Sequence, residues 1–101
     1  MLHNVNRQIL IFLALLLIGN SSQAAGVTQG AMLSNSCSAC HGTDGKSPGA
    51  IPSIYGKSVG FISQALKEFR DGKRPATVMG RHAKGYTDQE IQLIAEHFSS
   101  L

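Results

Sequence analysis

Two cysteines and a histidine form the clearest chemical motif in this sequence, in the order Cys37, Ser38, Ala39, Cys40, His41. Two thiols separated by two residues of a helical turn can add to the two vinyl groups of a haem. The histidine that follows then lies beside the porphyrin plane and can ligate the iron. This five-residue spacing is typical of covalent haem attachment. The sequence therefore predicts one covalent haem c, bound through Cys37 and Cys40 and ligated by His41.

The same motif has three other possible interpretations. A thioredoxin-like redox pair usually lies in a strand–helix context, and no convincing strand pattern occurs in this chain. A structural zinc site needs four ligands, and a second Cys or Cys/His pair at suitable spacing is missing. The third is a structural disulfide with His41 incidental. All three account for less of the motif than haem attachment does.

The second axial position of the iron has four candidate ligands, which are Met32, Met79, His82 and His97. Met32 precedes the motif by five residues on the same expected helix and cannot reach the opposite haem face. His97 lies near the end of the last expected helix, where a histidine commonly complements the helix dipole. Met79 lies in a Gly- and Pro-rich loop, 38 residues after His41, which leaves room for the chain to cross to the other haem face. It is therefore the favoured ligand, with His82 as the alternative. A Met/His pair raises the reduction potential.

Pro52 is a candidate for the support of His41. A ligating histidine usually donates its second ring N–H to a carbonyl or carboxylate, which fixes its tautomer and orientation. The rigid dipeptide Ile51-Pro52 follows the motif closely and could supply that carbonyl. An ordinary loop proline is the alternative interpretation.

Three helices joined by Gly- and Pro-rich loops are expected, and the first of them carries the cysteines of the motif. The first spans Val27 to Cys40, and the second spans Phe61 to Asp71. Thr87 and Glu90 have the spacing of a capping box, which predicts the start of the third helix. Its apolar face comprises Ile91, Ile94, Ala95 and Phe98. Residues 42–60 and 73–86 are expected to be loops, and the fold class is all-α.

The amino-terminal residues 1–24 are predicted to be a cleaved secretory signal peptide. Ile9 to Ile18 is a run of ten apolar residues, and Ser22-Gln23-Ala24 offers small residues at the positions that a signal peptidase reads. A membrane span needs roughly 20 apolar residues, so no span is expected in the mature chain. An uncleaved tether is the alternative. A disulfide or haem in an exported protein fits a periplasmic location.

The remaining residues, 25–101, form one expected domain of 101 − 24 = 77 residues. Its charge is 8 basic minus 6 acidic residues, or +2, which is too mild to indicate a nucleic-acid partner. A core of this size is marginal without a metal, a disulfide or a cofactor. A buried haem would supply the missing core.

Taken together, these motifs resemble the class I c-type cytochromes across almost the whole mature length. The resemblance rests on the Cys37 to Gly42 motif, on Pro52-Ser53-Ile54-Tyr55-Gly56, on Met79 and on the final amphipathic helix. It implies three or more helices around a haem with an exposed edge. It also implies that His41 and Met79 ligate the iron, that the Pro52 carbonyl orients His41, and that Gly30 packs against the last helix near Phe98.

Several segments are more specifically similar to the cytochrome subunit of flavocytochrome c sulfide dehydrogenases. They are residues 40–45, 52–54, 74–81 and 83–88. This resemblance implies a redox partner, an exported flavoprotein that oxidises sulfide and passes electrons to the haem. The chain departs from two-haem members of that group, since it has one Cys-x-x-Cys-His motif.

Electron transfer without a substrate is thus the expected function. A free soluble periplasmic carrier is the alternative to a haem subunit. A small haem peroxidase would need an open axial position and a distal acid or base, which Met79 ligation disfavours. A gas or redox sensor is a further alternative, although no attached signalling segment is evident.

Overall fold

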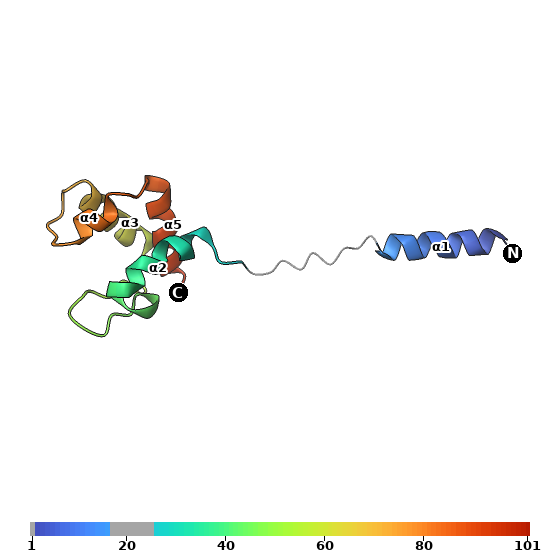
Figure 1. Ribbon diagram of the computed structural model, residues 1–101, viewed down its shortest axis with the longest axis horizontal. Coiled ribbons are helices and arrows are strands. Elements are labelled where there is room, and N and C mark those ends of the chain that lie inside the picture. Colours follow the sequence, from blue (N-terminus) through green and yellow to red (C-terminus); the bar gives the residue numbers. More distant parts are fainter. Residues whose placement is uncertain (1, 17–25) are drawn as a thin grey trace.

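The computed structural model describes residues 2–16 and 26–101, and within these ranges the chain is helical without a strand. Figure 1 shows the order of the elements along the chain. They are α1 (Leu2–Leu16), α2 (Gln29–His41), the 3₁₀ turn η1 (Thr43–Gly45), α3 (Val59–Arg70), α4 (Met79–Ala83) and α5 (Asp88–Ser99). The predicted all-α class is confirmed.

Side-chain caps explain where the three longer helices of the globular part begin. The hydroxyl of Thr28 accepts the Ala31 N–H at the start of α2, and that of Ser58 accepts the Phe61 N–H at the start of α3. Each cap satisfies one of the N–H groups that a helix start leaves without an intrahelical partner. The predicted capping box is present at α5, where Thr87 and Glu90 exchange hydrogen bonds of 2.8 and 3.1 Å.

The core forms where α2 and α3 each pack against α5. The predicted apolar face of α5 is the buried one, and its four residues are Ile91, Ile94, Ala95 and Phe98. Gly30 of α2 lies against α5, since a Cβ added there would stand 2.7 Å from the Leu93 carbonyl oxygen. The absence of a side chain at Gly30 therefore allows α2 and α5 to approach closely, one turn from Phe98.

The second predicted loop, residues 73–86, contains a helix that sequence analysis missed. Met79 to Ala83 form α4, which packs against α3 and buries Ala83 completely. Gly80 suggested a loop, but in the structure it lies beside the backbone of α3, with a Cβ position 3.6 Å from the Phe69 carbonyl oxygen. The glycine permits a close helix contact here, and tertiary packing outweighs its low helix propensity.

The other boundaries differ by one or two residues. The structure begins α2 at Gln29, because Thr28 caps it, and ends it at His41. It begins α3 at Val59, since Ser58 is the cap, and ends it at Arg70. Such shifts are the usual scale of disagreement at helix ends.

Arg70 links the end of α3 to the start of α5 through hydrogen bonds. Its guanidinium donates to Asp88 at 2.6 Å, to Asp71 at 3.0 Å and to the Tyr86 carbonyl at 3.3 Å. The pKa values of the Asp71 and Asp88 carboxyl groups are lowered from their ordinary values, mainly because each accepts a hydrogen bond from Arg70. This cluster fixes the segment that leads from α4 to α5.

The amino-terminal helix α1 covers part of the predicted signal segment. The expected cleavage position after Ala24 lies outside the described residues. In the ranges 2–16 and 26–101, none of the helices has both the length and the apolar character that a membrane crossing requires.

Candidate functional site

A cavity of about 950 Å³ lies among α2, the loop after η1, α3, the segment around α4, and α5. All five residues that the sequence nominated contribute to its lining, namely Cys37, Cys40, His41, Pro52 and Met79. They come from three separate parts of the chain. The fold therefore gathers residues up to 42 positions apart around one space.

Helix α2 presents the cysteines and the histidine over its last turn. Cys37 is 8% exposed and Cys40 is exposed, and both are free thiols. Residues three apart in a helix share a face, so the two thiols lie on the same side of α2. Burial raises the pKa of the Cys37 thiol above its ordinary value. Gly42, at φ 85°, ends the helix directly after His41.

His41 is oriented by a hydrogen bond from its ring to the Pro52 carbonyl. The distance between Nδ1 and the carbonyl oxygen is 2.6 Å. A carbonyl oxygen can only accept, so Nδ1 carries the proton and donates. Such a hydrogen bond to Nδ1 leaves Nε2 as the ring nitrogen that can bind a metal.

The loop that supplies Pro52 is organised by the carbonyl of Gly45. This oxygen accepts the N–H of Ile54 at 2.9 Å, the N–H of Tyr55 at 3.1 Å and the hydroxyl of Ser53 at 2.8 Å. Gly45 is buried with φ 73°, and a Cβ there would stand 2.6 Å from Ile54 Cγ1 and 3.1 Å from the Phe98 ring. A glycine is therefore required at this position for both conformation and space.

Replacement of Gly45 by alanine is expected to lower the free energy of unfolding of the haem-loaded protein by about 2 kcal/mol or more. The left-handed conformation costs an L-residue about 1–2 kcal/mol, and the clash adds to that cost. Guanidinium unfolding measures the change. The matched control is Gly56→Ala, because Gly56 also has a positive φ, of 70°, but open space around it. Equal losses in the two variants would contradict the role of the Gly45 contact.

Met79 and His82 both lie on α4 and both line the cavity, but they differ in their contacts. Met79 is partly buried and packs against the core. His82 is exposed, its Nε2 lies 3.3 Å from the Ser36 hydroxyl, and its ring makes an edge contact with Tyr86. The other two sequence candidates, Met32 and His97, are not among the lining residues. The protein already engages His82, whereas the Met79 sulfur has no such partner among the described residues.

Sequence analysis missed the far wall of the cavity. Part of the apolar face of α3, to which the sequence assigned no role, lines the cavity through Phe61, Ala65, Leu66 and Phe69. Three cations, Lys57, Arg74 and Arg81, also contribute to the lining. The 3.6-residue periodicity was visible in the sequence, but it does not distinguish burial against protein from burial against a cofactor.

The residues present fit a haem. Pockets for large organic ligands have volumes of about 300–1,000 Å³ and are mostly apolar with a few placed polar groups. This cavity has that size and character, with two thiols and a histidine oriented by the Pro52 carbonyl at one side. Cys37, Cys40 and His41 would hold the group from α2, and the walls from α3 and α5 would cover it.

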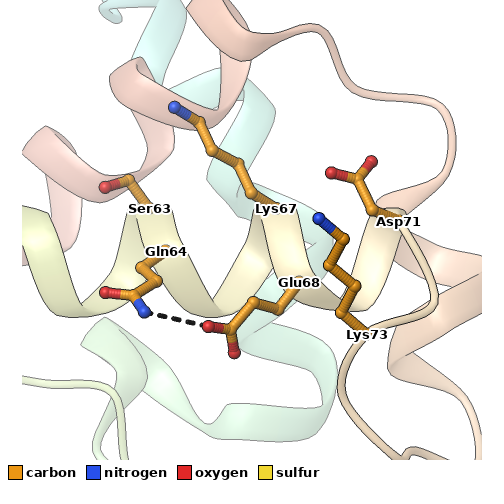
Figure 2. Close-up of a pocket in the computed structure, with 6 residues that line it drawn as sticks. All are labelled: Ser63, Gln64, Lys67, Glu68, Asp71 and Lys73. Carbon is orange, nitrogen blue, oxygen red and sulfur yellow. Dashed lines mark hydrogen bonds between the residues drawn. The ribbon is translucent and has the colours of Figure 1, made fainter.

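A second, smaller hollow of about 250 Å³ lies on another side of α3 (Figure 2). It is lined by polar and charged side chains, which are Ser63, Gln64, Lys67, Glu68, Asp71 and Lys73. None of the residues that the sequence nominated lies in it. Its chemistry is that of a solvated helix surface.

Comparison with known proteins matches the chain to one family and to several curated relatives. The family model described as "Cytochrome c" matches residues 27–101. The chain is 61% identical over 74 residues to the cytochrome subunit of sulfide dehydrogenase of Chlorobaculum tepidum, covering 73% of this chain and 67% of that protein. It is 40% identical over 68 residues to cytochrome c-554(548) of Halomonas halodenitrificans, covering 63% of this chain and 82% of that protein.

A longer relative is matched over a smaller share. Identity to cytochrome c-552 of Acidithiobacillus ferridurans is 38% over 65 residues, which are 64% of this chain and 28% of that protein. The residues that the family model matches, 27–101, contain the cavity and the helices that line it.

Proposed function

We propose that the electron donor of this chain is an exported flavoprotein of a sulfide dehydrogenase. The chain belongs to the cytochrome c family and carries electrons through a covalently bound haem c. The observation that carries the proposal is the 61% identity to a cytochrome subunit of sulfide dehydrogenase. The segments that resemble that group, residues 40–45 and 74–81, flank the cavity on both sides.

We assign the cofactor contacts from the geometry of the cavity. Cys37 and Cys40 bind the porphyrin through thioether bonds, and His41 and Met79 ligate the iron. The bond of 2.6 Å from His41 to the Pro52 carbonyl supports the first ligand, because it orients the ring and directs Nε2 away from the carbonyl. The partly buried position of Met79 on the cavity wall supports the second.

The chain's own residues prepare the site for electron transfer. The haem supplies an iron that changes between the ferrous and ferric states. His41 stays fixed in one tautomer, so the ligand geometry changes little between the two states. The apolar walls from α3 and α5 exclude water and lower the local dielectric. With His41 and Met79 both serving as iron ligands, no position on the iron would remain for a substrate, which would separate this carrier from a peroxidase.

The rim of the cavity supplies a docking face for a protein partner. Ile51 and Val78, which line the cavity, are 43% and 64% exposed, and Tyr55, which does not line it but lies in the same loop as Ile51, is 40% exposed. Ile54, in the same loop, is partly buried and packs against the core. Exposed apolar side chains at the edge of a redox site favour a stable complex over a brief, salt-steered encounter.

Export to the periplasm belongs to the same proposal. Residues 1–24 act as a signal peptide, and residues 25–101 form the mature cytochrome domain. The apolar run and the small residues before Ala25 support this division. Haem attachment through cysteines also fits an exported protein.

Native purification tests the partner. We expect the haem absorbance to elute well before the monomer volume in size-exclusion chromatography, together with a flavin absorbance, at low and at high salt. Sulfide should then reduce the haem in that fraction. Haem that elutes only at the monomer volume, without flavin, would reject the subunit and leave a free periplasmic carrier.

A further inference from the structure

Three side chains join α2 to the segment that carries Met79. The Ser36 hydroxyl oxygen lies 3.3 Å from Nε2 of His82 and 3.5 Å from the hydroxyl oxygen of Tyr86. The His82 and Tyr86 rings make an edge contact, with 6.2 Å between their centres. A serine hydroxyl has one proton and two lone pairs, so it can accept from Tyr86 while it donates to Nε2 of His82. Ser36, His82 and Tyr86 thus form a bridge, the Ser36 bridge, between segments 46 to 50 residues apart.

The Ser36 bridge reaches the face of α4 that carries Met79. Met79 and His82 are three residues apart on this helix, so they lie on the same face, and both line the cavity. Ser36 lines the cavity from α2, where it directly precedes Cys37. The bridge therefore connects the helix that carries the haem-binding cysteines to the helix that carries the proposed methionine ligand.

Tyr86 is the anchored end of the Ser36 bridge. Its carbonyl accepts a hydrogen bond of 3.3 Å from the Arg70 guanidinium, and its N–H donates to the Ala83 carbonyl at 3.2 Å. Tyr86 is half-buried, whereas Ser36 and His82 are exposed. The two contacts of the Ser36 hydroxyl are long for hydrogen bonds, and water competes for the exposed groups. The bridge is therefore weak and can open without disturbing the rest of the domain.

We propose that Ser36 and Tyr86 are positioning residues, which hold His82 and thereby keep Met79 on the iron and small ligands away from it. The proposal rests on the assignment of Met79 as the second iron ligand. Met79 must move before another molecule can reach that side of the iron. A movement of α4 that withdraws Met79 also displaces His82, because the two residues are one turn apart, so it breaks the Ser36 bridge. The bridge makes this movement less favourable and leaves the iron ligands of the resting protein unchanged.

Imidazole added to the ferric haem protein tests the bridge, because it can bind this side of the iron only after Met79 has left. Ser36→Ala is expected to raise the equilibrium constant for imidazole binding by roughly two- to fivefold, which corresponds to the lower half of the range for a net hydrogen bond. The loss of the weak red absorption band that a sulfur ligand gives to ferric haem measures the binding. Ser36→Thr keeps the hydroxyl and should behave as the wild type. The matched control is Ser38→Ala, the same substitution on α2 at a residue that does not line the cavity.

A double variant shows whether Ser36 acts through His82. His82→Ala should raise the imidazole constant to a similar extent as Ser36→Ala does. The combination of the two substitutions should add little to either alone, since residues that share one contact have non-additive effects.

Hydrogen–deuterium exchange of the haem protein gives a second measurement, which does not depend on the added ligand. The N–H groups of Arg81 and His82 both donate to the Val78 carbonyl at the start of α4. They should exchange faster in Ser36→Ala than in Ser38→Ala, whereas the N–H groups of α5 should exchange equally in both variants. A purely structural loss of stability would accelerate exchange in α5 as well.

Each measurement can overturn the proposal. Equal imidazole constants in Ser36→Ala and Ser38→Ala, or additive effects of Ser36→Ala and His82→Ala, would exclude the bridge as the restraint on Met79. Faster exchange in α5 of Ser36→Ala would show a general loss of stability instead. A wild type without the red band would reject Met79 as the ligand, and failure of the flavoprotein partner is detected separately, by the native purification.

Discussion

Replacing both Cys37 and Cys40 by alanine should abolish covalent haem attachment. Each thiol forms one thioether, so either single variant should keep at most one bond and the double variant none. Acid–acetone extraction followed by absorbance of the extract measures the fraction of haem that leaves the protein. We expect almost no extraction from the wild type and complete extraction from any haem that the double variant retains.

Ser38→Ala is the matched control for the cysteine variants. Ser38 lies between the two cysteines, and its carbonyl, not its hydroxyl, accepts the N–H of Gly42 that ends the helix. The variant should therefore keep both thioethers. If the haem of the wild type extracted completely, the c-type assignment would be wrong.

The second large effect concerns the sulfur ligand. Met79→His should lower the reduction potential by an amount on the order of 0.1 V or more, within the roughly 0.8 V over which axial ligands set haem potentials. Imidazole stabilises the ferric state better than a thioether does. The weak ferric absorption band at the red edge of the visible spectrum, which needs a sulfur ligand, should disappear. Redox titration and the ferric spectrum measure both changes.

His82→Ala is the control that separates the two candidates on α4. Its ring lies 3.3 Å from the Ser36 hydroxyl and is exposed, so its loss should leave the red band and the potential nearly unchanged. A wild type without the red band, whose potential changes in His82→Ala but not in Met79→Ala, would identify His82 as the ligand instead.

The parts of the fold that followed from sequence are those with local signals. The capping box at Thr87 and Glu90 and the apolar spacing after it located α5 and its buried face, because both depend on residues within one or two turns. The motif at the end of α2 identified the cofactor for the same reason. The all-α class followed from these helices.

The parts that were missed depend on contacts between distant segments. Helix α4 exists because Ala83 and Gly80 pack against α3, which a segment rich in glycine and proline does not reveal. The order of the first loop comes from the Gly45 carbonyl, whose three donors lie 8 to 10 residues further along the chain. Likewise, the pairing of Arg74 with Glu68 joins a loop to a helix.

The two proposed iron ligands are anchored with unequal strength. His41 ends a helix of 13 residues, and its ring is tied to Pro52. Met79 begins a helix of five residues whose cap, Val78, offers no side-chain hydrogen bond. A helix of this length has little stability of its own and depends on its contact with α3. Subglobal opening of α4 would therefore release the sulfur while α2 and its thioethers stay folded, so exchange of the methionine ligand is a local unfolding equilibrium, with a free energy well below that of the whole domain.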